Sequence, residues 1–565
     1  MEYLRVSRRA PAAWLSAVFP SFQVTLLVAI HVTAAIIMLV SEQGIVEKLA
    51  FLLTWALLNC FFLVLLRRPI TVGALSLLLI VSLIQLSRFK YEVIWMTINF
   101  LDLMIVDADT VSFLLGIFPN LGKILLGCFL VAIPLFVLMW RGDSYRVRRG
   151  LAACGVVASL LGLTTVSFTA PQEHWEEFLP GSHISKFVRS GVESLSEFWH
   201  RGYLESDAAA SGHLGVIDDS CATTGKRPNI ILIHDESSFD IRVVPGIKLP
   251  PDYGPHFKSF DGKQRRFMVE SNGGASWFAE YNVLAGLSSR SYGRFSYFLT
   301  RVAAGRVERG LPRTLQRCGY HTYTLYPALG AFMSARSFHT SAGIEHFIDA
   351  KAMGAEGVEP DSFYYGKAAE ILAQERGEPA FVFVYLAANH FPWEDRFQPE
   401  LTPGWKDPGN EPKIDEYLRR QTMSARHYSD FLARLKRDFP MESFLIVRYG
   451  DHQPEFAAPL LEPGIGEEAL AQRMATFDPR YFSTYYGIDV LNFKPSHMAS
   501  ALDKLDAPYL PLVIQQLAGL PLGPSFGEQK RIFERCAGVY YECKDGAESR
   551  RFNRLLIDAG FIKGL

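Results

Sequence analysis

The chain has 565 residues and a net charge of −1, with 57 Lys and Arg against 58 Asp and Glu. This length exceeds that of an ordinary single domain, and the balanced charge argues against a general nucleic-acid-binding protein. Long apolar stretches dominate residues 1–170, while the remainder has the mixed composition of a globular domain. The sequence therefore predicts a membrane part followed by a soluble part.

Five apolar stretches in residues 1–170 approach or reach the ~20 residues that a helix needs to cross a bilayer. The alternative, core helices of a soluble domain, would show a polar face, which these stretches lack. We expect transmembrane helices at Phe22–Val40, Leu49–Leu66, Ile70–Ser87, Ile124–Trp140 and Leu151–Ala170.

Basic residues mark one side of this predicted membrane part. They gather before the first span and after the second and fourth spans, whereas the loop after the first span carries only Lys48. Because basic loops stay in the cytoplasm, five spans put the soluble part on the opposite side. The residues concerned are Arg5, Arg8, Arg9, Arg67, Arg68, Arg141, Arg146, Arg148 and Arg149.

Residues 88–119 mix apolar side chains with carboxylates such as Asp102 and Asp109, which is typical of an interfacial amphipathic segment. A sixth span is the alternative, but it would bury several carboxylates in the membrane. Residues 171–227 follow the last span and read as a helical stalk and a loose linker. The predicted domains are thus residues 1–170, the connector 171–227, and a soluble domain at 228–565.

Four cysteines belong to the soluble side of the chain, where disulfides are permitted. Cys536 and Cys543 bracket a short loop, so we favour their pairing, which leaves Cys221 with Cys318 if all four are oxidised. Three connectivities remain open on the sequence alone.

Three apolar runs in the soluble domain end at polar, metal-competent residues. NIILI (229–233) leads into His234-Asp235-Glu236, FVFVYLAA (381–388) into Asn389-His390, and FLIVRY (444–449) into Gly450-Asp451-His452. Such runs are typical of strands buried on both faces, and predicted helices alternate with them. We expect an α/β domain with a largely parallel sheet, whose ligand site lies beyond the carboxyl ends of the strands.

The residues Glu236, Asp451 and His452 offer the mixed oxygen and nitrogen ligands of a divalent metal site, with Mn²⁺, Zn²⁺ or Mg²⁺ as candidates. Taken alone, Glu236 is better explained as a helix cap or a surface ion pair. Ser276 follows a Gly-containing loop and opens a predicted helix, where an oxyanion is favoured and a metal-activated hydroxyl would act as a nucleophile. The plain alternative is that Ser276 only caps this helix.

The motifs in this order resemble the sulfatase-like branch of the alkaline phosphatase superfamily, and more closely the lipoteichoic acid synthases and the phosphoglycerol and phosphoethanolamine transferases of bacterial envelopes. The matching stretches are NIILIHDESS (229–238), GGASWFAEYNVLAGLS (273–288), NHFPW (389–393) and YGDHQP (449–454). Ser276 stands where the family has Thr, and Ala275 where it has Gly. Sulfatases that form formylglycine need Pro and Arg where this chain has Phe278 and Glu280, so that chemistry is disfavoured.

The resemblance implies one divalent metal held by Glu236, Ser276, Asp451 and His452, with Ser276 as the covalent nucleophile. It further implies catalysis or substrate binding by His390, and substrate binding by Asn389, Trp393 and Arg336. A solvated helix charge explains Arg336 equally well.

We therefore expect a multi-pass enzyme of a bacterial inner membrane, with its catalytic domain in the periplasm. It would move phosphoglycerol from phosphatidylglycerol to an envelope glycan or lipid acceptor through a phosphoseryl intermediate. The alternatives are a phosphoethanolamine transferase acting on lipid A or a glycan, and a non-catalytic membrane sensor that has kept the fold.

Overall fold

A computed structural model describes residues 12–104, 106, 108–118, 120–210, 212–214, 221 and 227–564. Arg5, Arg8 and Arg9 lie outside the described residues. The chain divides into two compact units, Met1–Leu101 with Phe118–Ser196, and Asp102–Ile117 with Glu197–Leu565. The connector predicted at residues 171–227 contributes residues to both units.

The first unit contains the predicted membrane helices. Five helices in the described part of the chain are long and apolar enough to cross a membrane, at Phe22–Ser41, Ile45–Leu66, Pro69–Val93, Leu121–Gly142 and Arg149–Thr169. This confirms the prediction of five spans, and residues 88–119 add no sixth span among the residues described. The helices are α1 (Ala12–Ser41), α2 (Ile45–Leu66), α3 (Pro69–Ile94), α5 (Leu121–Gly142) and α6 (Arg149–Thr169).

Two of the basic loops meet at one end of this helix bundle. The backbone amide of Val147 donates to the carbonyl of Arg67 over 3.0 Å, and Arg68 donates to the carbonyl of Trp140. The buried carboxylate of Asp143 accepts from the amides of Ile70 at 2.9 Å and Thr71 at 3.0 Å, and so satisfies the first turn of α3. The loops after the second and fourth spans therefore share one side, as their charge predicts.

Helix α7 (His183–Arg201) buries polar side chains against the membrane helices. Its His183 Nδ1 lies 2.8 Å from Ser87 Oγ, and the amide of Ile184 donates to Glu42 Oε1 over 3.2 Å. Arg189 lies 3.2 Å from Glu176 in the preceding turn. These partners explain why the first part of α7 belongs to the membrane unit.

The second unit is built on an eight-stranded sheet with the order β4-β3-β5-β1-β6-β7-β2-β8. Only β7 runs antiparallel to its neighbours β6 and β2, so the sheet is largely parallel, as predicted. The strands are β1 (Asn229–Asp235), β2 (Arg265–Met268), β3 (His321–Tyr326), β4 (His346–Asp349), β5 (Ala380–Tyr385), β6 (Phe444–Gly450), β7 (Ser483–Leu491) and β8 (Lys504–Asp506).

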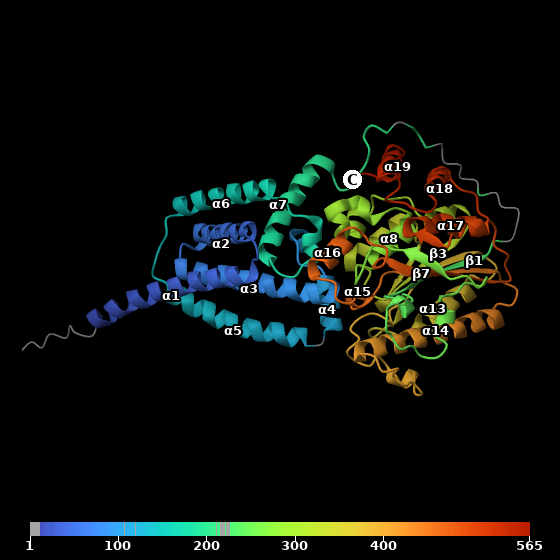
Figure 1. Ribbon diagram of the computed structural model, residues 1–565, viewed down its shortest axis with the longest axis horizontal. Helices are drawn as coiled ribbons and strands as arrows, with labels where there is room; N and C mark the ends of the chain where they lie inside the picture. Colours follow the sequence, from blue (N-terminus) through green and yellow to red (C-terminus); the bar gives the residue numbers. More distant parts are fainter. Residues whose placement is uncertain are drawn as a thin grey trace, which may run out of the picture. The chain divides into compact units, whose positions relative to one another are not determined.

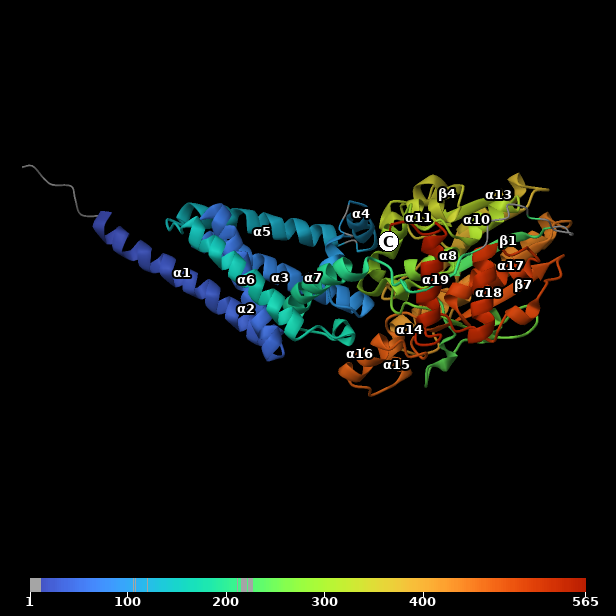
Figure 2. The same ribbon diagram turned by 90° about the horizontal axis from the view of Figure 1, so that it is seen from above.

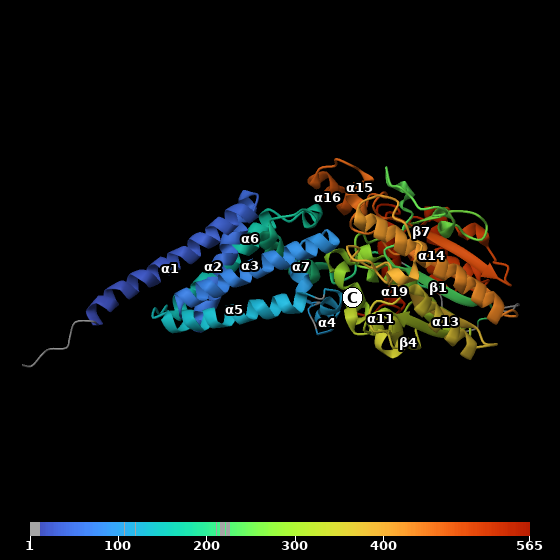
Figure 3. The same cartoon turned by 90° about the horizontal axis from the view of Figure 1, so that it is seen from below.

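Helices cover both faces of the sheet. Figure 1 shows α13 and α14 together on one face; they lie in front when the molecule is seen from below (Figure 3), whereas α8, α17 and α18 lie in front when it is seen from above (Figure 2). The longer helices are α4 (Ala108–Ile117), α8 (Trp277–Ala285), α10 (Leu311–Arg317), α11 (Ala335–Ala342), α13 (Asp361–Gln374), α14 (Pro412–Asp438), α16 (Glu467–Ala475), α17 (Leu510–Leu517), α18 (Pro524–Cys536) and α19 (Ala547–Asp558). Shorter ones are α9 (Leu299–Ala303), α12 (Ala350–Met353) and α15 (Ala457–Leu461).

The central strands are wholly buried, which is why their sequences are continuous apolar runs. One core cluster joins the side chains of β1, β5 and β6 to those of α13 and α14, and includes Ile231, Val382, Ile446 and Phe431. Both disulfides favoured by the sequence are present, Cys536–Cys543 and Cys221–Cys318.

Candidate metal centre

The site lies where two neighbouring parallel strands end. His234 pairs with Tyr449, and Asp235 with Gly450, in the register of β1 and β6. Glu236 follows β1 and Asp451 follows β6, so the two carboxylates emerge side by side at one edge of the sheet. Gly450 permits this approach, because a Cβ at that position would lie 1.7 Å from the carbonyl oxygen of Ser238.

Three buried side chains at this edge form a group able to hold a metal ion. The ligand atoms of His234, Glu236 and Asp451 all lie within 4.8 Å of one another. His234 Nε2 is 3.1 Å from Asp451 Oδ2 and 4.0 Å from Glu236 Oε2. His452 completes the arrangement, with its Nε2 at 3.3 Å from both Glu236 Oε1 and Asp451 Oδ2.

The donor atoms fit a divalent cation. His234 Nε2 and Asp451 Oδ2 are buried and have no hydrogen-bond partner of acceptable geometry among the described residues, although they lie close together. Buried polar atoms normally have such partners, so two of them facing one space mark a place for a ligand. Carboxylate oxygens and imidazole nitrogens suit Zn²⁺ or Mn²⁺, and carboxylates suit Mg²⁺.

The charges within this group are tightly coupled. Burial would raise the pKa of Glu236, but the hydrogen bond and charge of His452 outweigh burial and hold that pKa well below its usual range. Burial would lower the pKa of His452, yet the carboxylates of Asp451 and Glu236 raise it to about 9. The same balance, led by Asp451, raises the pKa of His234. Without a cation, protons on the imidazoles therefore compensate the carboxylates.

Ser276 points its hydroxyl into the metal-binding group. It precedes α8 with helical dihedrals and makes no side-chain capping bond. Its Oγ instead donates to Glu236 Oε2 over 3.0 Å and lies 3.2 Å from His452 Nε2. The capping role considered from the sequence is therefore not what this hydroxyl does.

The loop before Ser276 bends through left-handed backbone conformations. Gly273, Gly274 and Ala275 have φ of 68°, 152° and 60°. This region is open to glycine but costs about 1 kcal/mol for alanine. The amide of Gly273 donates to the carbonyl of Gln453 over 2.9 Å, which fastens the loop to the turn that carries His452.

Side chains around the group hold its ligands in place. Tyr449 OH lies 2.7 Å from His234 Nδ1, so the other ring nitrogen faces the carboxylates. Tyr385 OH donates to Glu236 Oε2 over 2.9 Å, and burial raises the pKa of Tyr385 well above its usual range, which keeps that proton in place. Asp451 Oδ1 accepts the amide of Ser237 at 2.7 Å.

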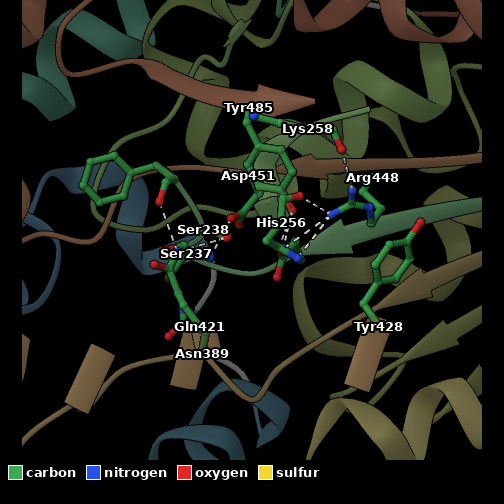
Figure 4. A network of polar contacts seen from close by, with 12 residues as sticks. Ser237, Ser238, His256, Lys258, Asn389, Gln421, Tyr428, Arg448, Asp451 and Tyr485 are labelled. Carbon is green, nitrogen blue, oxygen red and sulfur yellow. Dashed lines mark hydrogen bonds and ion pairs between the residues drawn. The ribbon is translucent and has the colours of Figure 1, made fainter. Parts of the chain in front are cut away.

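Sequence reasoning missed His234 as a ligand, although it quoted the cluster that contains it. The alternation of side chains along a strand carries the signal: His234 and Glu236 share one face of β1, whereas Asp235 points to the other. There Asp235 Oδ2 lies 3.4 Å from His256 Nε2 and accepts a hydrogen bond from the hydroxyl of Tyr485. Arg448 joins His256 in this second network, which Figure 4 shows beside Asp451.

The remaining site residues proposed from the sequence lie in different settings. Asn389 is buried and its Nδ2 donates to the carbonyl of Ser237 over 3.4 Å, and the ring of the neighbouring His390 stacks on Phe391 with centroids 4.2 Å apart. Trp393 is only 2% exposed and packs in a core cluster with Tyr417 and Phe456. Arg336 pairs with Asp349 at 2.6 Å. The structure thus brings Glu236, Ser276, Asp451 and His452 together, but engages Trp393 and Arg336 with other residues.

Comparison with known proteins agrees with this fold. Residues 271–476 match the sulfatase family model. The match covers the loop of Ser276 and the turn of Asp451 and His452, and it confirms the resemblance to the sulfatase-like branch of the alkaline phosphatase superfamily. Residues 271–476 of the soluble unit are therefore similar to sulfatases, and the same chain contains a multi-pass membrane part.

Individual relatives are distant. A protein of Rhizobium meliloti (strain 1021), named for the modification of cyclic β-1,2-glucan, is 23% identical over 260 residues, which are 45% of this chain and 40% of that protein. This chain therefore matches two fifths of that relative's length. The phosphoglycerol transferase GacH of Streptococcus pyogenes is 15% identical, with 59% of this chain and 85% of that chain covered and a TM-score of 0.45. The lipooligosaccharide phosphoethanolamine transferase A of Neisseria meningitidis is 14% identical, with 85% and 96% covered and a TM-score of 0.46.

Proposed function

We propose that this chain is a metal-dependent transferase of a bacterial inner membrane. It moves phosphoglycerol from phosphatidylglycerol to an envelope glycan in the periplasm, through a covalent intermediate on Ser276. The observation that carries the proposal is the Ser276 hydroxyl, held 3.0 Å from Glu236 and 3.2 Å from His452 inside a buried group of carboxylates and imidazoles. The alternative of a non-catalytic sensor is disfavoured, because the chain keeps this serine together with the surrounding carboxylates and imidazoles.

In the first step, Ser276 Oγ attacks the phosphorus of the lipid phosphodiester. The bond from phosphorus to the diacylglycerol oxygen breaks, and His390 gives that oxygen a proton as it leaves. Glu236 accepts the hydrogen bond of the attacking hydroxyl and is placed to receive its proton. A divalent cation held by His234, Glu236, Asp451 and His452 would supply positive charge that favours the serine alkoxide and the phosphoryl oxygens.

In the second step, a hydroxyl of the acceptor attacks the same phosphorus and the bond to Ser276 Oγ breaks. The acceptor's proton passes to His390, and the proton held on Glu236 returns to Ser276 Oγ as its bond to phosphorus breaks. The start of α8 favours the anionic oxygens in both steps. Splitting one displacement in two lets a buried site exchange a lipid for a glycan.

The acceptor class has separate support. The relative from Rhizobium meliloti is named for modification of a cyclic glucan, and a glycan hydroxyl is chemically suited to the second step. Phosphatidylglycerol is the donor favoured by the stretch Glu280–Gly286 and by His390 to Trp393. Asn389 and His390 stand as substrate contacts in this proposal, while Trp393 and Arg336 stay predictions.

The test is turnover of head-group-labelled phosphatidylglycerol by the purified full chain, with a glycan acceptor and with added Mn²⁺, Zn²⁺ or chelator. We expect metal-dependent release of diacylglycerol and a glycerophosphoryl adduct on Ser276, which Ser276→Ala abolishes and Ser276→Thr retains. If phosphatidylethanolamine instead gave an ethanolamine-phosphate adduct on Ser276, the proposed donor would be wrong and the covalent mechanism would stand. Full activity of Ser276→Ala would overturn the covalent route.

A further inference from the structure

We infer that a cavity in the membrane unit binds the head group of a membrane phospholipid through its phosphate. The cavity has a volume of about 340 Å³ and is lined by residues of α1, α3 and the turn before α7. Its polar lining comprises Ser41, Gln43, Arg88, Tyr91, Glu92 and His183. None of these residues takes part in the metal centre.

The position of the cavity along the helices matches the depth of lipid phosphates. The first span ends at Ser41 and the third at Val93, and Arg88 and Glu92 occupy the last turns of α3. Tyr91 and Trp95 flank this level, as aromatic residues do at membrane interfaces. The basic loop at Arg67 and Arg68 lies at the other end of α3, so the cavity opens on the opposite, predicted extracytoplasmic side of the bilayer.

The walls of the cavity are fixed by hydrogen bonds. The amide of Ser182 donates to the carbonyl of Ser41 over 2.8 Å, and the amide of Gln43 donates to Ser182 Oγ over 3.3 Å. His183 Nδ1 lies 2.8 Å from Ser87 Oγ on α3. Gly181 has a φ of +87°, and a Cβ there would lie 3.1 Å from Gln43 Nε2. Hydrogen bonds therefore hold the turn that bounds this cavity, and the cavity is preformed without a ligand.

Two polar groups in the cavity lack partners. Ser41 is 8% exposed, and its Oγ has no hydrogen-bond partner among the described residues. Arg88 is exposed, and within the described part of the chain it makes neither an ion pair nor a hydrogen bond. The exposed Arg88 guanidinium suits a phosphate, which accepts charge-assisted hydrogen bonds from it, whereas Ser41 Oγ is itself buried beside the cavity.

Glu92 decides which phosphate is favoured. It follows Arg88 by four residues, so the two side chains share one face of α3. A carboxylate beside the cavity repels a free phosphate dianion but accepts hydrogen bonds from a head group with hydroxyl or ammonium donors. A phosphodiester of the phosphatidylglycerol or phosphatidylethanolamine type meets both demands, and its acyl chains would run along the apolar spans.

The inference rests on the proposed function only in its link to a phospholipid donor, because binding here needs neither Ser276 nor a metal. The test therefore measures binding without turnover. The full chain carrying Ser276→Ala is purified in detergent and examined by native mass spectrometry with added phosphatidylglycerol, phosphatidylethanolamine, phosphatidic acid or glycerol 3-phosphate.

We expect retention of phosphatidylglycerol or phosphatidylethanolamine, about tenfold weaker binding in Arg88→Gln, and recovery in Arg88→Lys. Arg149→Gln is the matched control, since Arg149 begins α6 on the predicted cytoplasmic side. Glu92→Gln should increase the binding of phosphatidic acid relative to that of phosphatidylglycerol.

Equal losses in Arg88→Gln and Arg149→Gln would show general charge attraction and overturn the site. Retention of glycerol 3-phosphate equal to that of the phospholipids would also overturn the site, because the acyl chains would then contribute nothing to binding. Thermal unfolding of each variant separates a lost site from a lost fold. If lipid binding persists while wild-type turnover is absent, the proposed function fails and this site stands.

Discussion

Single residues at the metal centre act through their neighbours as much as through their own ligand atoms. Tyr449 contacts His234 Nδ1 at 2.7 Å, and His234 Nε2 in turn faces Asp451 at 3.1 Å. Residues that orient a metal-binding imidazole typically contribute 10–100-fold to metal affinity or activity. The phenol is therefore a positioning group, remote from the substrate.

Tyr449→Phe should lower metal affinity by about 10–100-fold while leaving the fold intact. The reason is that His234 Nδ1 loses the oxygen that fixes its ring. Isothermal titration with Zn²⁺ or Mn²⁺ measures the effect. The control is Tyr509→Phe, another buried tyrosine whose hydroxyl bonds only a backbone carbonyl, that of Val539. Equal affinity in both variants would contradict the role given to Tyr449.

The raised pKa of His452, about 9, makes metal binding depend on pH. Metal must displace the protons of His452 and His234, so apparent affinity should rise by about tenfold or more per pH unit between pH 7 and 8.5. Without metal, the stability of the folded state has the opposite dependence and falls as the pH rises. A raised folded-state pKa gives stability that is complete below the ordinary value of ~6.5 and is lost as pH rises through about 9.

Titration calorimetry across that pH range, in buffers of different ionisation enthalpy, counts the released protons. His321→Gln is the control, because the pKa of His321 is also raised, by Glu375, but at an exposed position away from the metal ligands. The control should keep the wild-type slope. A flat affinity in the wild type would show that His452 is already neutral.

At the scale of elements, the ends of β1 and β6 fix the centre. Their apolar sequences and terminal polar residues were enough to predict the strands, the largely parallel sheet and the convergence of Glu236, Asp451 and His452. The strands β4, β7 and β8 were missed, because β4 and β8 are short and the run of β7 is interrupted by Gly487 and Asp489. His234 was missed because it lies inside the strand, and the alternation that puts it on the same face as Glu236 was not applied to it.

Gly450→Ala should destabilise the soluble unit by roughly 2–4 kcal/mol, since a Cβ 1.7 Å from the Ser238 carbonyl forces β6 away from the turn after β1. Urea unfolding and metal titration should both report the loss. Gly366→Ala in α13 is the control. Its Cβ would meet no atom within 4 Å, so it should be neutral or slightly stabilising. Similar stability of the two variants would refute this account.

At the scale of the whole molecule, the two disulfides differ in the length of chain they close. Cys221 and Cys318 are 97 residues apart, and Cys536 and Cys543 only 7. In the chain-entropy view the longer loop contributes about 5 kcal/mol and the shorter one about 2 kcal/mol. The difference follows from constraints on the unfolded chain alone.

Replacing the first pair by serine should therefore lower the unfolding temperature several degrees more than replacing the second pair. Differential scanning calorimetry of the two double variants, with and without reductant, makes the comparison. The reductant should no longer affect a variant that lacks both pairs. Equal shifts from the two replacements would mean that strain or residual structure outweighs loop length.

The pairing of His234 with Tyr449 and of Asp235 with Gly450 has a last consequence. The two faces of β1 carry unlike chemistry, with the metal ligands on one and the contacts to His256 on the other. Inserting one residue near the middle of this strand would turn the strand side chains after the insertion to the opposite face of the sheet. Asp235, rather than His234, would then lie on the metal-binding face. A shift of one position would therefore leave a folded strand whose end no longer presents the metal ligands on the correct face of the sheet.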